Sequence, residues 1–384
     1  MKIWGITGTN GKTTTTWTLA QLLGGEKTCG HVTTVEIWTG ARRFYSGYTT
    51  PPLPLLKETF SEMAANGLEH CTMEVSSHAI HQHRTGDTVF AGGAFTNLTE
   101  DHLDYHKTME AYFEVKADFF RRLAAANPGA PAAVCMDGEY GRRLAEICRK
   151  LPLALVTCST RGPADFAARD IKVSQEGAEF TLAAERLGGE FAVKCPLTGR
   201  FNVENVIVAA ALAWGAGVSG KRILAEIPKL TPRWGRLERV PCGSKGAVFV
   251  DFAHTDDALA NVLSTVKGFT PGKVWAVFGA GGDRDRRKRP LMGAAAAAHA
   301  DRLVVTRDNP RNENPQSIID EIAAGIPLGT MVCYEVDRAK AIRFALENAA
   351  AGDSVVICGK GHETTQEIAG EKFHFDDREV ARGF

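Results

Sequence analysis

The sequence predicts an α/β protein with two domains, each built on a mostly parallel sheet, and three observations support this. The chain has 384 residues, more than the ~250–300 residues that one hydrophobic core usually serves. It opens with a short apolar run, a glycine-rich turn and a helix-compatible segment. Its second half repeats short apolar runs that each end in a polar cluster, as parallel strands do at the carboxyl edge of a sheet.

Composition excludes several classes of protein. Hydrophobic residues make up 44% and charged residues 23% of the chain, as in ordinary globular proteins. The 45 basic residues balance 45 acidic ones, so net charge predicts neither nucleic acid nor a membrane as a partner. Nine scattered cysteines without a C-x-x-C pair indicate reduced, mostly buried thiols. We see no signal peptide and no apolar run near ~18 residues, so we expect a cytoplasmic protein.

The first 19 residues predict a nucleotide-phosphate site. A short apolar strand is followed by the turn and helix start Gly8, Thr9, Asn10, Gly11, Lys12, Thr13 and Thr14. Such an arrangement points backbone N–H groups and a helix N-terminus at a phosphate. Lys12 would reach the β- and γ-phosphates, and the Thr13 hydroxyl would bind Mg²⁺. The strict pattern G-x-x-x-x-G-K-[ST] is not met, because Ile6 stands at its first glycine. A chance Gly-Lys-Thr in a loop is therefore the alternative.

The next segments are a β-rich stretch over residues 31–48 and a helix over residues 55–66 that stops at Gly67. Between them, Thr49 and Thr50 precede two prolines. On local grounds this T-T-P-P segment is as compatible with a simple turn as with a binding site.

Two further strands end in polar clusters. A strand over residues 71–75 carries Glu74 at its carboxyl end, where an acid beside a phosphate loop is placed to hold a metal. A strand over residues 91–96 leads into residues 97–106, which contain three acids and two histidines, one of them His102. This density exceeds what a solvated loop needs. An amphipathic helix over residues 108–123 contains Lys116, whose position alone indicates only a surface lysine.

These motifs resemble those of the Mur ligases, most closely the MurE branch, which adds the third amino acid of the peptidoglycan stem peptide. The resemblance rests on residues 8–13, 73–78 and 95–106 and on Lys116. It implies an ATP-dependent ligase with two Mg²⁺ sites. Thr13, Glu74 and His102 match magnesium ligands, and Lys116 matches a lysine that is carbamylated to bind the second ion. A protonated lysine could not bind a cation, so the chemistry needs that modification or an equivalent acid. Lys12, Glu74, His102 and Lys116 are thus the expected catalytic residues.

The resemblance also assigns substrate and nucleotide contacts in the first domain. Thr49, Thr50, Ser76 and Arg84 match positions that contact the acceptor peptide and its muramoyl part. Residues 131–197 alternate short segments with few site-like clusters. Residues 199–205 open an alanine-rich helix and could be only a helix cap. In the family the second asparagine of this segment packs against adenine, and Asn205 matches it.

Residues 228–241, with three prolines, predict a connection between domains. The family match assigns Arg236 in this segment to the ATP phosphates. It implies a P-loop-type, mostly parallel ATP-binding domain over residues 1–234. A Rossmann-like α/β domain that binds the amino acid follows over residues 235–384.

In the second domain, strands over residues 248–254, 273–280, 302–306 and 354–358 each end in a polar cluster, and together these predict a site at the sheet edge. By resemblance, Asp251 and His254 lie near the ATP ribose and phosphates. The residues expected to hold meso-diaminopimelate are Arg284, Asn309, Arg311, Gly359 and Glu363. Arg284 and Arg311 can form forked bonds to a carboxylate, and Glu363 can pair with an ammonium. A lysine substrate would strand a buried arginine, at a cost of roughly 3–5 kcal/mol.

The sequence departs from the family pattern in three places. Family members carry a further domain that binds UDP ahead of the phosphate loop, whereas this sequence starts at the loop. Asp256 and Arg307 stand where the family has proline and usually serine; Arg307 adds a cation beside the amino-acid site.

Three hypotheses therefore stay open. The first is a ligase that joins diaminopimelate or a close analogue to a γ-glutamyl-type carboxylate, on a small-molecule or peptide acceptor without UDP. The second is the same chemistry on UDP-MurNAc-Ala-Glu, with the absent domain supplied by a partner chain or not needed. The third is a non-catalytic nucleotide-binding paralogue.

Overall fold

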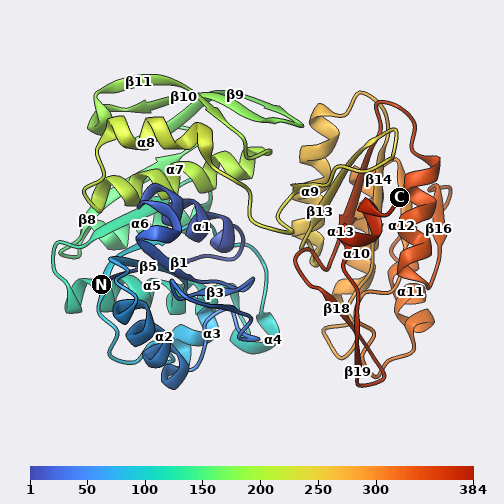
Figure 1. Ribbon diagram of the computed structural model, residues 1–384, viewed down its shortest axis with the longest axis horizontal. Coiled ribbons are helices and arrows are strands. Elements are labelled where there is room, and N and C mark those ends of the chain that lie inside the picture. The colour runs from blue at the N-terminus through green and yellow to red at the C-terminus, as the bar shows by residue number, and fades with distance from the viewer. The chain divides into compact units, whose positions relative to one another are not determined.

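The computed structural model describes residues 1–384, which divide into two compact units (Figure 1). Unit 1 holds residues 1–172 and 176–231, and unit 2 holds residues 173–175 and 232–384. None of the helices combines the length and the apolar character needed to cross a bilayer.

Unit 1 is built on a sheet of 11 strands in the order β11-β10-β9-β8-β7-β6-β1-β5-β2-β3-β4. Their bounds are β1 Lys2–Thr7, β2 Cys29–Val32, β3 Ile37–Trp38, β4 Arg43–Phe44, β5 His70–Glu74, β6 Phe90–Phe95, β7 Pro131–Cys135, β8 Ala154–Ser159, β9 Phe166–Ser174, β10 Gly177–Ala184 and β11 Gly189–Cys195. Neighbouring strands from β2 through β5, β1, β6, β7 and β8 to β9 run parallel. The pairs β2–β3, β3–β4 and β10–β11 are antiparallel. The carboxyl ends of the parallel strands therefore share one edge, and the phosphate loop follows β1 at this edge.

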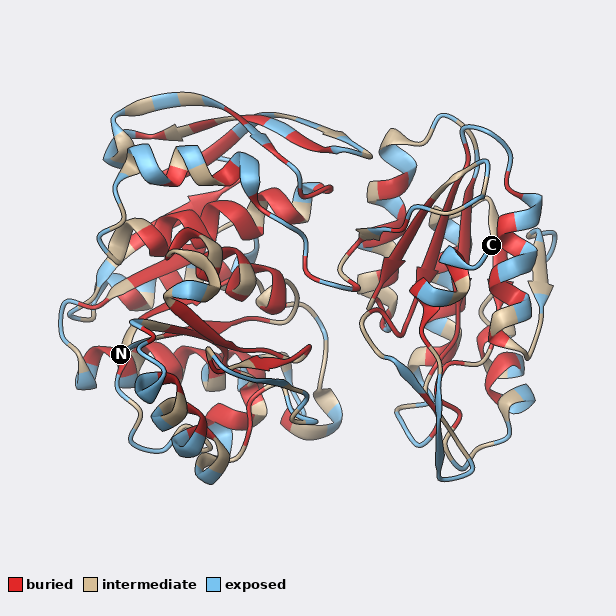
Figure 2. Cartoon of the chain, viewed as in Figure 1, coloured by how far each residue is buried: buried red, intermediate tan, exposed pale blue.

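Helices cover both faces of this sheet. They are α1 Lys12–Leu22, α2 Leu53–Ala65, α3 Ser77–His81, α4 Leu103–His106, α5 Met109–Ala126, α6 Glu139–Arg149, α7 Arg200–Gly215 and α8 Gly220–Glu226, with 3-10 turns at Gly25–Lys27, Glu185–Leu187 and Ile227–Lys229. Helices α1 and α7 pack on each other and on the strands, and α8 covers both. Helix α5 packs with α3 and α6 and buries its aromatic side chains in the core of the unit. Figure 2 shows the central strands buried and the outer helix surfaces exposed.

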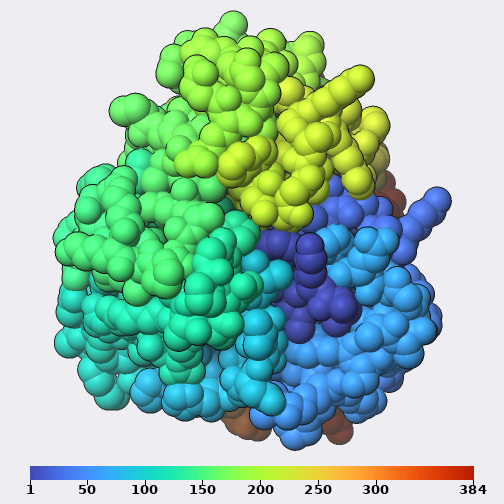
Figure 3. Space-filling model, turned by 90° about the vertical axis from the view of Figure 1, so that its left-hand side faces the viewer, coloured from blue at the N-terminus to red at the C-terminus, as the bar shows by residue number.

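The amino edge of the same sheet carries a surface hollow. It is lined by the ends of β1, β6 and β7 and includes Met1, Lys2, Phe90 and Pro131. Figure 3 shows this face of unit 1, with the N-terminal residues in dark blue. No residue assigned to a site from the sequence lines this hollow, so the chemistry is expected at the opposite edge.

Unit 2 is built on a sheet of six strands in the order β12-β13-β17-β14-β15-β16, with a separate hairpin β18–β19. Their bounds are β12 Glu238–Arg239, β13 Ala247–Asp251, β14 Val274–Phe278, β15 Arg302–Val305, β16 Val332–Tyr334, β17 Ser354–Cys358, β18 Thr365–Ile368 and β19 Glu371–His374. All neighbours from β13 to β16 are parallel, and only β12 is antiparallel. The mostly parallel α/β sheets predicted from the sequence are confirmed in both units.

The helices of unit 2 form two groups. Their bounds are α9 Asp256–Phe269, α10 Lys288–His299, α11 Pro315–Ala323, α12 Arg338–Asn348 and α13 Asp377–Arg382. Helix α10 packs against α9 and α11, whereas α12 packs against α13. Alternate strand residues such as Val250, Val277 and Val304 share one core with α12 and α13. Because successive strand residues point to opposite faces, the two helix groups cover the two faces of this sheet.

Candidate active site

The phosphate loop has the conformation that its glycines predict. Gly8 and Gly11 have positive φ values of 147° and 82°, which glycine adopts without strain. A Cβ on Gly11 would lie 2.1 Å from Asn205 Oδ1, so the loop packs directly on α7. The backbone N–H of Asn10 donates to Asn97 Oδ1 at 2.9 Å. The loop is thus held between α7 and the segment after β6.

Two lysines meet at this loop. Lys12 Nζ donates to the carbonyl oxygens of Gly8 at 3.0 Å and Thr9 at 2.8 Å. Lys116 Nζ donates to the same Gly8 oxygen at 2.8 Å, although α5 is more than 100 residues further along the chain. The Lys116 side chain is buried, with 1% exposure. Burial first, and the charge of Lys12 second, hold the pKa of Lys116 well below its ordinary value of 10.5.

Glu74 connects the loop to β2 and to the T-T-P-P segment. Its Oε1 accepts from Thr13 Oγ1 and from the Thr34 backbone N–H, both at 2.8 Å. Its Oε2 accepts from Thr34 Oγ1 at 3.2 Å. Glu74 is buried at the end of β5, next to β1 in the sheet. A hydroxyl and a carboxylate at this separation are hard oxygen donors of the kind that Mg²⁺ prefers.

His102 lies in a histidine-rich group formed by α3 and α4. It has a positive φ of 56°, and its ring lies 4.8 Å from that of His78 and 6.2 Å from that of Tyr112. Partial burial lowers the pKa of His102, and the nearby carboxylate of Asp101 only partly offsets this. Its ring is therefore neutral near pH 7 and offers a nitrogen lone pair.

The residues assigned to the acceptor cluster around Glu74. Thr49 Oγ1 and Thr34 Oγ1 lie 3.0 Å apart, at hydrogen-bond distance, and Thr50 Oγ1 donates to the Glu74 carbonyl at 2.8 Å. The Ser76 N–H donates to Thr50 Oγ1 at 2.9 Å. Arg84 donates to the Thr50 carbonyl at 3.3 Å. The T-T-P-P segment is therefore hydrogen-bonded to the end of β5 and to the residues that follow it.

Asn205 is buried at the phosphate loop. Its Oδ1 accepts from Thr15 Oγ1 at 3.2 Å, and its Nδ2 donates to Asn202 Oδ1 at 3.1 Å. The first bond joins α1 to α7, and the second lies within α7. In this structure Asn205 supports the loop that follows β1.

In unit 2, Asp251 is bound by backbone groups. It accepts from the N–H of Leu237 at 2.6 Å and of Ala253 at 2.7 Å. Burial raises the pKa of Asp251, and the charge of Arg236 and these two N–H groups oppose that rise. Arg236 lies over the Phe252 ring at 4.7 Å, and the exposed His254 lies 4.7 Å from the same ring. The three residues assigned to ATP in this unit are therefore neighbours.

The five residues assigned to the amino acid lie in the loops after β14, β15 and β17, three adjacent strands. Asn309 Nδ2 donates to Glu363 Oε2 at 2.8 Å. Arg311 has a φ of 51° and donates to the Gly282 carbonyl at 2.6 Å. A Cβ on Gly281 would meet Arg311 Nη1 at 3.0 Å and Arg284 Cγ at 3.5 Å, so both arginines flank this glycine.

Gly359 completes this region. It has a φ of 113°, and a Cβ there would lie 2.4 Å from Asp308 Oδ2. The close approach of the two loops requires glycine at this position.

A buried arginine supports the loop after β14. Arg289, 1% exposed, forms two bonds of 2.8 Å to the Glu313 carboxylate and donates to the Gly281 carbonyl at 3.1 Å. Glu313 Oε1 also accepts from the Asp283 N–H at 2.6 Å. Its side-chain bonds to Arg289 lower the pKa of Glu313 to about 2, although partial burial opposes them.

Sequence reasoning missed several contributors. Thr34 binds both oxygens of Glu74, and Lys360 binds Asn309 and Glu363. The hairpin β18–β19 holds the segment before Arg311: Glu367 N–H donates to Asn309 Oδ1 at 3.0 Å. Lys360 had a sequence signal, since it lies between two glycines directly after a strand.

Comparisons with known proteins identify the family. A family profile described as Mur ligase middle domain matches residues 6–213, and one described as Mur ligase, glutamate ligase domain, matches residues 235–361. The chain belongs to the Mur ligase family. This membership makes it an ATP-dependent acid–amino-acid ligase, and the family predicted from the sequence is confirmed.

Curated relatives of this Mur ligase extend over its whole length. The UDP-N-acetylmuramoyl-L-alanyl-D-glutamate--2,6-diaminopimelate ligase of Synechococcus elongatus is 43% identical over 385 residues, covering 100% of this chain and 76% of that protein. The ligase of the same name from Bacillus licheniformis is 41% identical over 387 residues, covering 100% of this chain and 78% of that protein.

Solved structures of Mur ligases and related enzymes have the same fold as this chain. A structure of a ligase with that name has a TM-score of 0.70 and 37% identity, covering 100% of this chain and 78% of its own. The folylpolyglutamate synthase of Mycobacterium tuberculosis, solved with ADP and AMPPCP, has a TM-score of 0.70 at 18% identity, covering 93% of this chain and 88% of its own. At that identity the second comparison supports the fold alone.

Proposed function

We propose that this Mur ligase uses ATP to join meso-diaminopimelate, or a close analogue, to a γ-glutamyl-type carboxylate in peptidoglycan synthesis. The observation that carries the proposal is the charge pattern in unit 2. Arg284 and Arg311 flank Gly281, and the Glu363 carboxylate follows the neighbouring strand. The distal end of diaminopimelate carries one carboxylate and one ammonium, which this pattern complements.

The pocket should prefer diaminopimelate over lysine by a smaller free energy than it would if Arg311 were fully buried. The Arg311 side chain is 22% exposed, lies 3.5 Å from the Glu367 carboxylate and already donates to Gly282. The missing substrate carboxylate therefore costs about 1–3 kcal/mol, the price of one lost charged hydrogen bond, and less than the value expected from the sequence.

The reaction proceeds in two balanced steps. The acceptor carboxylate attacks the γ-phosphorus of ATP, an O–P bond forms, and the bond to the β-phosphate breaks to release ADP. The neutral amine of the amino acid then attacks the acyl carbon and a C–N bond forms; the acyl C–O bond breaks, inorganic phosphate leaves, and the nitrogen loses one proton to solvent or to the leaving phosphate. Lys12 would place its positive charge beside the transferring phosphoryl group.

We assign two Mg²⁺ ions to residues near the loop, on the chemistry of their donor atoms. The Thr13 hydroxyl, the Glu74 carboxylate and the neutral His102 ring would hold one, and a carbamylated Lys116 would hold the other. Magnesium ions offset negative charge on the transferring phosphoryl group. Burial of Lys116 favours the neutral amine, the form that reacts with carbon dioxide.

The test is phosphate release from ATP with Mg²⁺, diaminopimelate and two acceptors in parallel. One acceptor is UDP-MurNAc-Ala-Glu, which the names of the relatives favour, and the other is the same dipeptide group without UDP. Turnover with the nucleotide form alone supports the relatives' substrate. Turnover with the UDP-free form assigns a different acceptor. Absence of phosphate release with both acceptors would refute the proposed ligase.

The amino-acid assignment has its own control. Arg311→Ala should raise KM for diaminopimelate by about 10- to 100-fold and leave KM for ATP unchanged. An unchanged KM for diaminopimelate would refute the pocket.

A further inference from the structure

Lys360 occupies an unusual position at the end of β17. The residues on either side, Gly359 and Gly361, have positive φ values of 113° and 53°. A Cβ on Gly361 would lie 2.7 Å from Phe252 Cβ, so the chain there passes close to its neighbours. This tight turn directs the Lys360 side chain inward, where it has 0% exposure.

The buried ammonium is fully bonded. Lys360 Nζ donates to Asn309 Oδ1 at 3.2 Å, Glu363 Oε2 at 2.9 Å and the Thr365 carbonyl at 2.6 Å. A lysine ammonium has three N–H donors, so each has one acceptor. A buried charge is stable only when paired and hydrogen-bonded in this way. The group has no donor left for a substrate, which excludes it as a direct ligand of the amino acid or of a phosphate.

The two carboxylate oxygens of Glu363 differ in their hydrogen bonds. Oε2 accepts from both Lys360 and Asn309, whereas Oε1 has no partner within the protein. The Glu363 side chain is 31% exposed. One oxygen is therefore fixed from the inside, and the other is left accessible to an incoming cation.

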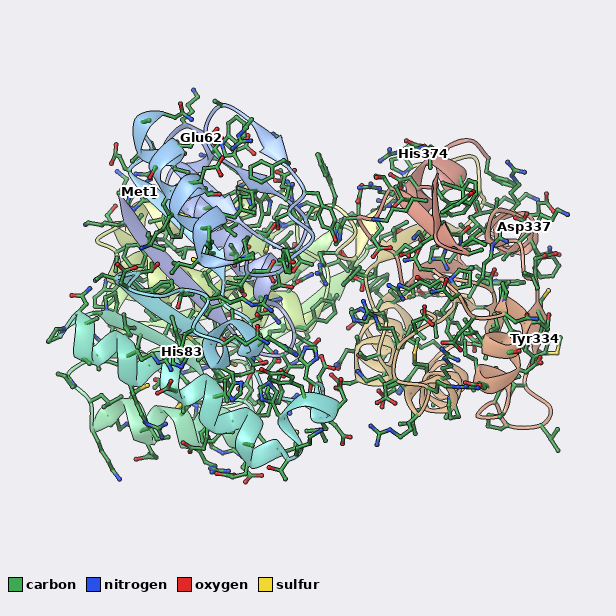
Figure 4. The ribbon with its side chains drawn as sticks, turned by 90° about the horizontal axis from the view of Figure 1, so that it is seen from below. Met1, Glu62, His83, Tyr334, Asp337 and His374 are labelled. Carbon is green, nitrogen blue, oxygen red and sulfur yellow. The ribbon has the colours of Figure 1, made fainter.

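The hairpin β18–β19 also holds Lys360 and Asn309 in place; we call these two residues, Glu363 and β18 the frame of the amino-acid subsite. Its first strand supplies the Thr365 carbonyl to Lys360 and the Glu367 N–H to Asn309 Oδ1. Its second strand is exposed along its whole length, and Figure 4 labels His374 at its end. Lys360 thus joins the turn after β17 and the start of β18 to Asn309, which lies 51 residues earlier in the chain.

We propose that Lys360 is a positioning residue of the amino-acid subsite, which fixes Glu363 and Asn309 so that Glu363 Oε1 receives the ammonium of the amino acid. This inference rests on the proposed function, because it gives Glu363 the role of binding that ammonium. It adds a residue that acts only through the two side chains it holds.

The first experiment compares Lys360→Met with Lys372→Met in the full chain. Methionine retains most of the apolar stem and removes the charge, and the exposed Lys372 of β19 is the matched control. Lys360→Met should raise KM for diaminopimelate by about 10- to 100-fold, by analogy with the loss of residues that orient the ligands of metal sites. KM for ATP should stay within about twofold, and Lys372→Met should match the unaltered chain. Equal KM values for diaminopimelate in both variants would overturn the proposal.

A double-mutant cycle tests whether Lys360 acts through Glu363. In a Glu363→Gln background, adding Lys360→Met should raise KM by less than about threefold, because coupled residues are not additive. If the KM increases of the two single substitutions multiplied in the double variant, Lys360 would act independently of Glu363, and its proposed positioning role would be refuted. If Lys360→Met lowers the folded fraction, Lys360→Gln keeps an N–H donor in similar space, and its KM should lie between the two. A KM for Lys360→Gln equal to that of the unaltered chain, with the variant folded, would also overturn the proposal.

The two failures are distinguishable. If the unaltered chain does not ligate diaminopimelate, the proposed function fails. If it does and the Lys360 variants keep its KM, only the role of Lys360 fails.

Discussion

At the scale of single residues, Lys116 combines a buried amine with a second ammonium close by. It shares the Gly8 carbonyl with Lys12 and lies over the Tyr112 ring at 4.7 Å. A permanent positive charge would be costly in such a place. Conversion to a carbamate would replace that charge with an anion and make the neighbouring cation an attraction.

We therefore expect Lys116→Met to lower kcat by at least about 10³-fold while the chain stays folded. The comparison is Lys150→Met, since Lys150 is exposed at the end of α6 and should leave kcat unchanged. Phosphate release gives kcat, and the thermal midpoint reports the fold. Full activity of Lys116→Met would exclude the carbamate.

At the scale of elements, the phosphate loop depends on its fit against α7. Gly11→Ala would place a methyl group 2.1 Å from Asn205 Oδ1 and also strain a φ of 82°. Gly129 has a similar φ of 88° but nothing within 4 Å, so Gly129→Ala adds strain without the clash. We expect Gly129→Ala to cost about 1 kcal/mol of stability and to leave ATP binding intact.

Gly11→Ala should instead weaken ATP binding by about 100-fold or more, because the loop must move away from α7. Isothermal titration with a non-hydrolysable ATP analogue would measure this. Equal ATP affinity in the two variants would show that loop packing on α7 does not shape the site.

The link between α10 and the loop after β14 predicts a pH dependence. The pKa of Glu313 falls from an ordinary 4.5 to about 2 on folding, so its carboxylate stabilises the fold fully above pH 4.5. This stabilisation is lost as the pH falls toward 2. Urea unfolding at pH 6 should find Glu313→Gln less stable by about 2–3 kcal/mol. The difference should shrink steadily below pH 4.5.

Glu347→Gln is the matched control, since Glu347 is exposed in α12. Its stability should follow that of the unaltered chain at every pH. A Glu313 effect that persists undiminished at pH 2 would contradict the assigned ion pair with Arg289.

At the scale of the whole molecule, the reactivity of the nine cysteines measures how well the hydrophobic cores of both units are closed to solvent. All are free thiols; Cys242 and Cys333 are half-buried, and the other seven are buried. Burial suppresses the thiolate, which is the reactive form, and partial burial raises the pKa of Cys333 as well. We expect a thiol reagent to modify at most two cysteines in the native chain and all nine in urea, as counted by mass spectrometry. Rapid native labelling of more than two would contradict the burial.

Much of this architecture could be predicted from short-range pattern. The strand ends at Glu74 and Asp251 follow from apolar runs that stop at an acid, and the parallel sheets follow from their repetition. The family resemblance assigns Lys116 to the site, whereas its position alone indicates a surface lysine; yet it lies between Tyr112 and Phe120 at four-residue spacing, on the buried stripe of α5. That spacing was a usable signal.

Other features had less signal. The flanking glycines mark Lys360, but its bond to Asn309 spans 51 residues, and no local pattern reports such a contact. The strands of β18–β19 are largely exposed and lack the apolar alternation that marks a half-buried strand. Their role depends on backbone hydrogen bonds, which any residue type can supply.

Because the hairpin β18–β19 lies near the C-terminus, the amino-acid subsite can be completed only late in protein synthesis. Asn309, Arg311 and Lys360 emerge from the ribosome before β18, yet their partners include Thr365, Glu367 and Ala369. A nascent chain interrupted after Glu363 would already contain every strand of both large sheets. It would lack the frame around the amino-acid subsite, so a prematurely ended translation product would contain the nucleotide loop and yet not select its amino acid.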